Sequence, residues 1–139
     1  MIRYIFLNTF IALYSFFLCL WGLLISLFDP EGGKVHRYCA VPWARGILRV
    51  CGIRVNVVGK AGVAFETPRI YMVNHQSFFD VFILLACLPA DFKFILKQEL
   101  MRIPLLGPAM KGAGYIAIER NDPREAVKSM NQAAQKIKN

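Results

Sequence analysis

Residues 70–85 read Ile-Tyr-Met-Val-Asn-His-Gln-Ser-Phe-Phe-Asp-Val-Phe-Ile-Leu-Leu, and their pattern indicates the fold class. The short apolar run at residues 69–73 is typical of a strand that is buried on both faces. A second apolar run starts at Val81 and predicts a helix that continues to about Leu88, because Pro89 then ends it. A buried strand that leads directly into a helix is the repeating step of an α/β fold.

Segments with strand and helix patterns alternate along the rest of the chain after residue 52. The strand patterns are apolar alternations or short apolar runs, at residues 53–58, 69–73, 92–96 and 115–118. Helices are predicted at residues 105–110 and 123–137, and the second has Asp122 as cap and Pro123 at its first position. We therefore predict an α/β domain over residues 34–139, with a parallel sheet of three or four strands and a loop at residues 59–68.

The N-terminal segment has the composition of a membrane anchor. Residues 4–28 carry no charged side chain, and a helix of that length measures about 38 Å at about 1.5 Å per residue. A bilayer core is about 30 Å thick, so the segment can span it with some tilt. A helical hairpin that dips into one leaflet is the alternative, whereas a cleaved signal peptide would need a shorter apolar run and a small-residue cleavage site. We assign residues 1–33 to a membrane anchor and a turn.

The segment after the turn predicts an amphipathic helix over residues 35–51. Arg37, Arg45 and Arg49 fall on one face of it, and Pro42 should kink or divide the helix near Val41. Such a helix can lie at a membrane surface or simply pack on the domain, and the pattern favours neither.

The net charge of +8 lies almost entirely after the anchor. This distribution favours anionic lipid headgroups or phosphate-bearing substrates as partners. Nucleic acid is not expected as a partner, because the sequence contains no recognition motif for it. The excess of arginine after the anchor predicts that the C-terminal part faces the cytoplasm.

The four cysteines predict reduced, mostly buried thiols rather than disulfides or a metal site. No Cys-x-x-Cys pair occurs. His36 and Cys39 have a zinc-like spacing, but a second ligand pair is missing, so no metal is expected.

His75 and Asp80 are the candidate catalytic residues. Five positions on a regular helix turn through about 500°, which would leave the two side chains about 140° apart. They can meet if His75 precedes the helix and Asp80 lies in its first turn, with Ser77 as the cap and Asn74 bracing the turn. Asp80 would then fix one ring nitrogen and leave the other free as a base. On spacing alone, a structural turn histidine beside a capping aspartate explains the pattern better.

Three ordered motifs resemble those of the lysophospholipid acyltransferase family, in particular its bacterial 1-acylglycerol-3-phosphate acyltransferases. The family's Asn-His-x-x-x-x-Asp box matches residues 74–80. Its Lys-x-Glu-Leu stretch, followed by Ile-Pro and Gly, matches residues 97–107. Its Gly-x-Ile-x-Ile-Asp-Arg block matches residues 114–120, with Glu119 in place of Asp.

The resemblance implies a role for each matching residue. His75 is the general base and Asp80 its partner, while Arg120 and Lys97 contact the phosphate of the acceptor, which suits the planar fork of arginine. Asn74 and Gly114 are the remaining predicted substrate-binding residues. The implied reaction moves a fatty acyl chain from acyl-CoA or acyl carrier protein to the free hydroxyl of 1-acyl-glycerol-3-phosphate (lysophosphatidic acid), giving phosphatidic acid without a cofactor.

Two alternatives remain open, and one motif is missing. The acceptor could be another lyso-lipid, for example a lyso-ornithine lipid, or the chain could be a non-catalytic membrane-binding module. The family's Phe-Pro-Glu-Gly-Thr-Arg block would follow the last helix, and the sequence stops at Asn139 before it. We therefore expect a domain that is truncated at its C-terminus, at a bacterial inner membrane and facing the cytoplasm.

Overall fold

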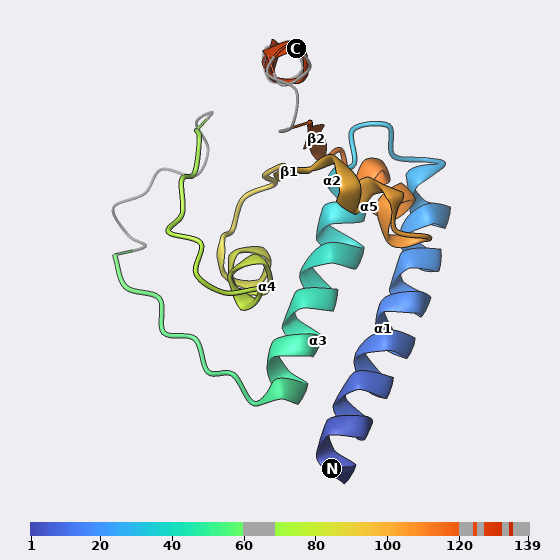
Figure 1. Ribbon diagram of the computed structural model, residues 1–139, viewed down its shortest axis with the longest axis vertical. Coiled ribbons are helices and arrows are strands. Elements are labelled where there is room, and N and C mark those ends of the chain that lie inside the picture. The colour runs from blue at the N-terminus through green and yellow to red at the C-terminus, as the bar shows by residue number, and fades with distance from the viewer. Residues whose placement is uncertain (60–68, 120–123, 125–126, 132–133, 135–139) are drawn as a thin grey trace.

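Two long helical stretches run antiparallel and form a hairpin, which Figure 1 shows in blue and cyan-green. The computed structural model describes residues 1–59, 69–119, 124, 127–131 and 134. Helix α1 covers Ile2–Ser26. The returning stretch consists of α2 (Gly33–Val35), the π-helix η1 (His36–Ala40) and α3 (Val41–Cys51). The predicted division near Val41 is not seen as a break: the helical path is continuous, and what changes is the helix type, because η1 ends at Ala40 and α3 begins at Val41, one residue before Pro42.

The two arms of the hairpin pack closely through small and aromatic residues. The Tyr14 hydroxyl donates a hydrogen bond to the Pro42 carbonyl at 2.8 Å, and its ring lies over Gly46. Further up the hairpin, Gly22 faces the side chain of Cys39. Helix α1 is the one helix among the described residues that is long and apolar enough to cross a membrane, and most of its surface is exposed.

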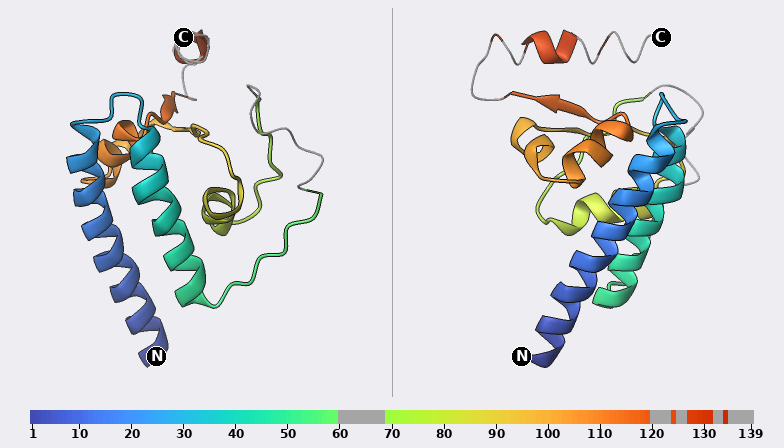
Figure 2. Two further views of the ribbon diagram at one scale, coloured as in Figure 1. Left: turned by 180° about the vertical axis from the view of Figure 1, so that it is seen from behind. Right: turned by 90° about the vertical axis from the view of Figure 1, so that its right-hand side faces the viewer.

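Helix α4 (Phe79–Cys87) packs against α3 on the side away from α1. Figure 1 and the left-hand view of Figure 2 show this arrangement from opposite sides. The rings of Trp43 and Phe82 meet edge to face with centroids 4.9 Å apart. Leu85 is fully buried in this contact region. The predicted helix after residue 77 is therefore confirmed, and it ends before Pro89 as expected.

A small parallel sheet completes the mixed α/β fold. Strand β1 (Ile95–Lys97) pairs with β2 (Ile116–Ile118) in the register Ile95 to Ile116 and Lys97 to Ile118. The connection between them contains the 3-10 helix η3 (Gln98–Arg102) and helix α5 (Leu106–Gly112). The predictions of a helix near residues 105–110 and a strand near 115–118 are confirmed.

The turn of the hairpin is the joint between the anchor and the sheet. The Asp29 carboxylate accepts a hydrogen bond from the Val35 N–H at 2.9 Å and so starts the returning helix. Gly32 has a φ of 74° and lies directly against the Ala113 backbone, where a Cβ would collide. Only glycine satisfies both conditions. The main core lies just below this joint and contains Val35, Cys39, Ala113 and Tyr115.

Two of the predicted strands are wrong. Residues 53–58 and 69–73 run as extended chain without strand pairing, and Ile70 and Met72 are 84% and 92% exposed. The physical reason is that a strand needs a neighbour for its backbone N–H and C=O groups. The described part of the chain offers these two segments no such neighbour, so the observed sheet has two strands rather than three or four. The strand predicted at residues 92–96 is shifted to Ile95–Lys97.

The remaining predictions fall partly outside the described residues. The loop at 60–68 lies outside them. Of the last predicted helix, residues 124, 127–131 and 134 are helical, while its cap, Asp122 and Pro123, is outside.

Candidate active site

The site is built on the first turn of α4, where the chain changes from extended to helical. The Ser77 hydroxyl oxygen accepts the N–H of Phe79 at 3.2 Å, and the Asp80 carboxylate reaches back to the N–H of Ser77 at 2.8 Å. This reciprocal pattern is a capping box with aspartate in place of glutamate. It holds the side chain of Asp80 in front of the helix, on the side where residues 74–76 approach.

His75 and Asp80 are in direct contact. His75 Nδ1 lies 2.9 Å from Asp80 Oδ2, and the same oxygen accepts the N–H groups of Gln76 and Ser77 at 2.8 Å each. The predicted fold-back of the imidazole to the carboxylate is therefore present. The backbone N–H groups of Ser77 and Gln76, followed by the bond from His75, hold the pKa of Asp80 below its ordinary value.

This geometry prepares His75 to act as a base. A carboxylate can only accept a hydrogen bond, so the Nδ1 of His75 carries the proton and Nε2 has a free lone pair. The side chain of His75 is 59% exposed, so Nε2 is accessible to a substrate. Asp80 thus orients the ring of His75, and the ring faces the solvent directly, without a nucleophilic side chain in between among the described residues.

The structure places the other predicted site residues at different points. Asn74 is exposed and directly precedes His75. Lys97 lies at the carboxyl end of β1, where its Nζ is 2.8 Å from a Glu99 carboxylate oxygen. Its register partner is Ile118, two residues before Arg120, and Arg120 itself lies outside the described residues. Ligands of parallel sheets commonly bind at this end of the strands.

Gly114 lies at the opposite end of β2 from Lys97. Its φ is 77°, and a Cβ there would lie 3.1 Å from the carbonyl oxygen of Glu31. The backbone thus turns tightly against the hairpin turn just before the strand. The structure gives Gly114 a reason to be glycine that is independent of substrate.

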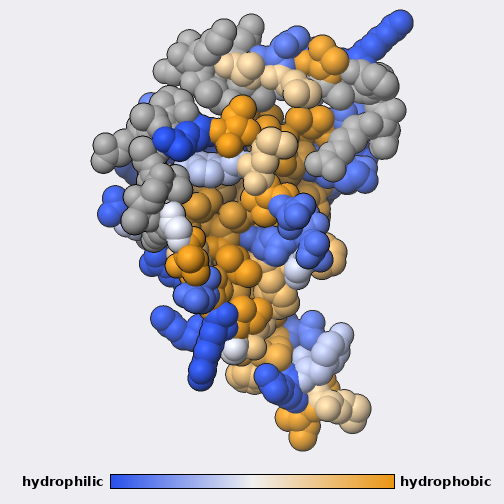
Figure 3. All heavy atoms as spheres, turned by 90° about the vertical axis from the view of Figure 1, so that its left-hand side faces the viewer, coloured by the Kyte–Doolittle hydropathy of each residue, from blue (hydrophilic) through white to orange (hydrophobic). Residues whose placement is uncertain are grey.

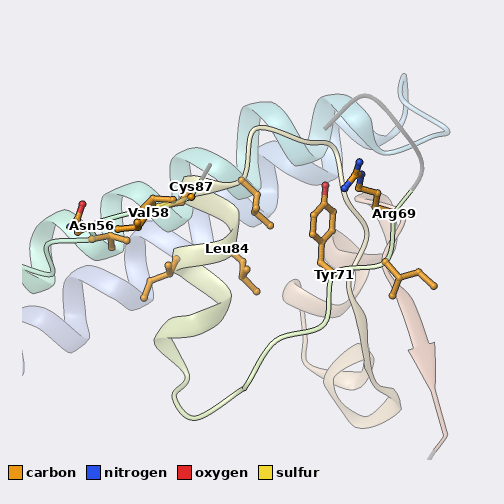
Figure 4. Close-up of a pocket in the computed structure, with 12 residues that line it drawn as sticks. Asn56, Val58, Arg69, Tyr71, Leu84 and Cys87 are labelled. Atoms are coloured by element: carbon orange, nitrogen blue, oxygen red, sulfur yellow. The ribbon is translucent and has the colours of Figure 1, made fainter. Parts of the chain in front are cut away.

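An apolar cavity of about 670 Å³ lies beside α4. Figure 4 shows Asn56, Val58 and Cys87 toward one end of the cavity, Arg69 and Tyr71 toward the other, and Leu84 between them. Figure 3 shows that apolar side chains form a continuous band along this side of the molecule. From the sequence, the apolar run of α4 predicts a helix but not a cavity beside it. The sequence did contain a signal for the cavity. The run is apolar on every side of the helix, so one side can face α3 while another lines a cavity.

The second histidine, His36, is buried and has a structural role. It is 3% exposed, and its Nδ1 lies 3.5 Å from the Tyr115 hydroxyl and 3.9 Å from an Asp91 carboxylate oxygen. Burial lowers the pKa of His36. This residue therefore joins the hairpin to the sheet and is closed to substrate. No group of three or more potential metal ligands occurs within the part of the chain that the structure describes.

Comparison with known proteins agrees with the motifs. The family model described as "Acyltransferase" matches residues 54–139. A chloroplastic 1-acyl-sn-glycerol-3-phosphate acyltransferase of Arabidopsis thaliana is 36% identical over 115 residues, which are 82% of this chain and 32% of that protein. The enzyme of the same name from Saccharomyces cerevisiae is 32% identical over 124 residues, 85% of this chain and 40% of that protein.

A bacterial relative, the 1-acyl-sn-glycerol-3-phosphate acyltransferase of Helicobacter pylori, is 32% identical over 99 residues, 68% of this chain and 41% of that protein. No solved structure matches. The chain spans about a third of the length of the first curated relatives that it matches. Because the family model covers well over half of the residues and includes the His75–Asp80 turn, the chain belongs to the acyltransferase family.

Proposed function

We propose that this chain carries the base of an enzyme that transfers a fatty acyl group from a thioester to the free hydroxyl of 1-acyl-glycerol-3-phosphate, giving phosphatidic acid. The observation that carries the proposal is the 2.9 Å contact between His75 Nδ1 and Asp80, with the ring otherwise exposed. We take the acceptor from the relatives, which are 1-acyl-sn-glycerol-3-phosphate acyltransferases by name.

The reaction follows from the position of the free Nε2. Nε2 takes the proton of the acceptor hydroxyl as that oxygen attacks the thioester carbonyl, so a C–O bond forms. The C–S bond then breaks, and the imidazolium returns the proton to the leaving thiolate. Asp80 remains a carboxylate throughout and stabilises the imidazolium. Neither a cofactor nor a covalent enzyme intermediate is required.

Direct transfer is favoured over a serine nucleophile. Ser77 is the hydroxyl closest in sequence to the pair, and its oxygen is occupied by the N–H of Phe79. That bond fixes the start of α4 and directs the hydroxyl toward the helix. Acyl-CoA and acyl carrier protein are both thioester donors, and the proposal admits either.

The apolar cavity is where we place an acyl chain. It is lined by Ile83 and Leu84, which lie on α4 within about a turn of Asp80. A volume of about 670 Å³ is within the usual range of ligand sites. We assign the acceptor phosphate to Lys97, at the carboxyl end of β1, and to Arg120, which follows the last residue of β2 by two positions in the sequence.

The hairpin is proposed to bind along one face of a membrane. Exposed apolar residues cover α1, including Phe6, Leu13, Phe17, Leu20 and Leu24. The neighbouring returning stretch carries exposed arginines at positions 37, 45 and 49. If α1 crossed the bilayer, the returning stretch beside it would carry these charges into the hydrocarbon, at about 2.5–3.5 kcal/mol each. We therefore place the whole hairpin, α1 and the returning stretch, in one leaflet along the membrane interface. The arginines then lie among the headgroups on the cytoplasmic side.

An acyl-transfer assay tests this function. The purified protein in phospholipid vesicles is given labelled acyl-CoA or acylated carrier protein, together with lysophosphatidic acid or a lyso-ornithine lipid. Labelled phosphatidic acid is the expected product, and it should disappear in His75→Ala while vesicle binding is unchanged. If the label is transferred only to the lyso-ornithine lipid, this lipid is the acceptor in place of lysophosphatidic acid. Vesicle binding without any transfer would support a membrane-binding module instead.

A further inference from the structure

Trp43 connects the lipid-facing helix with the helix that carries Asp80. Its indole N–H donates a hydrogen bond to the Ser15 hydroxyl on α1 at 2.8 Å. The other side of the ring meets Phe82 of α4 edge to face, with centroids 4.9 Å apart. One half-buried side chain on α3 thus touches both neighbouring helices.

The contact continues to the catalytic turn. The ring of Phe82 lies 5.9 Å from that of Phe79, which is the first residue of α4. The N–H of Phe79 is bound by Ser77, and Asp80 is the next residue in the chain. A row of three aromatic rings therefore runs from α3 to the turn that holds His75.

The other end of α4 has a separate fastening to the same helix. Arg45 on α3 donates a hydrogen bond from Nη2 to the Ala86 carbonyl at 3.4 Å, near the carboxyl end of α4. Trp43 and Arg45 thus hold α4 at two points. The Trp43 contact is the one near the catalytic turn, and it alone of the two extends to α1 through a hydrogen bond.

The His75–Asp80 pair does not need Trp43 for its own geometry. All three bonds to Asp80 Oδ2 come from residues 75–77, within the same turn. What Trp43 can determine is the position of this turn relative to α1, the helix with the exposed apolar surface. A lipid acceptor is presented at that surface, whereas a dissolved acceptor can approach His75 freely.

We propose that Trp43 is a positioning residue that holds the His75 turn at the correct height over the lipid surface, so that a membrane-bound acceptor hydroxyl reaches Nε2. The inference rests on the proposed acyl transfer. Displacements of about 1 Å can cost about 100-fold in rate when they misplace a catalytic group. Loss of the ring should therefore reduce transfer to membrane-bound acceptors selectively.

The test compares two acceptors in the full-length protein. One is long-chain lysophosphatidic acid in vesicles, under conditions where all protein is vesicle-bound. The other is a short-chain lysophosphatidic acid that is dissolved as monomers. For Trp43→Leu we expect the vesicle rate to fall about 10-fold or more, with the dissolved-acceptor rate within about 2-fold of wild type. Trp43→Phe keeps a ring against Phe82 and should recover most of the vesicle rate.

Ser15→Ala separates the hydrogen bond from the ring contact. It removes the acceptor for the indole N–H without touching α4, so it should lower the vesicle rate as much as Trp43→Phe does. The two changes together should cost no more than either alone. Phe28→Leu is the control, because Phe28 is an exposed aromatic residue in the hairpin turn, outside α1 and α4. It should leave the ratio of the two rates unchanged.

The outcomes are distinct. Equal losses with both acceptors in Trp43→Leu would mean general disruption of the fold and would overturn the proposal. Wild-type rates with both would overturn it as well. If His75→Ala retains full transfer, the proposed function fails instead, irrespective of Trp43.

Discussion

The packing of the hairpin makes a sharp prediction at Gly46. A Cβ at this position would lie 2.5 Å from the Tyr14 hydroxyl oxygen and 2.6 Å from its ring carbon Cε1. Gly46→Ala must therefore push the ring of Tyr14 out of the interface. In the absence of this contact, the same change in the middle of a helix would stabilise the protein by about 1 kcal/mol.

The two effects have opposite signs, and their sizes decide which one wins. Displacing Tyr14 breaks its hydrogen bond to Pro42, at about 1 kcal/mol. The half-buried ring of Tyr14 also loses part of its packing on α3, at about 1 kcal/mol. After the gain in helix propensity, Gly46→Ala should lower the free energy of unfolding by about 1 kcal/mol. The effect would also separate α1 from α3.

Gly22→Ala is the matched control on the facing helix. A Cβ there would meet Val35 and Cys39 at 3.6 Å, an ordinary contact distance. This variant should be as stable as wild type or up to about 1 kcal/mol more stable. Denaturant unfolding in detergent micelles measures both variants. If Gly46→Ala also stabilises the protein, or if Tyr14→Ala in the same chain fails to relieve the loss, the packing of α1 on α3 at Tyr14 is refuted.

Three further predictions concern separate parts of the chain. Gly107→Ala should destabilise the protein by about 1–3 kcal/mol in the same assay, since its Cβ would collide with the Met101 carbonyl, and a neutral result would contradict this packing. Burial raises the pKa of the Cys39 thiol to about 11, so alkylation at about pH 8 should be much slower at Cys39 than at the partly exposed Cys51, measured by mass spectrometry. Because the pKa of Asp80 is lowered, its charge is lost only as the pH falls below the ordinary value of 3.8. The carboxyl group of Asp80, followed by carbon NMR in the wild-type protein, should therefore show no titration between about pH 5 and pH 8, and a titration of this group within that range would contradict the assignment.

The helices could be predicted from the sequence because their signals are local. Pro89 ends α4, Pro42 marks the change from η1 to α3, and the cap of α4 involves only residues 77–80. The strands at 53–58 and 69–73 were predicted wrongly, because an apolar pattern shows which residues can enter a sheet but not whether a partner strand is there. The same pattern was correct at 115–118, where β1 provides the partner.

In the site, too, local contacts could be predicted from the sequence and long-range contacts could not. The contact of His75 with Asp80 joins residues five positions apart, so turn geometry was sufficient to predict it. The cavity and the Trp43 contacts join segments that are distant in sequence. Ser15, Trp43 and Phe82 have no common motif, and only the packing of three helices brings them together.

The central claim is that His75 acts as the base through Nε2, and chemical rescue tests it most directly. His75→Ala removes the imidazole but leaves the backbone of the turn and its bonds from Gln76 and Ser77 to Asp80 in place. We expect a loss of about 10²–10⁴-fold in acyl transfer, unchanged vesicle binding, and partial recovery of the rate when free imidazole is added. Transfer by His75→Ala at the wild-type rate would contradict it.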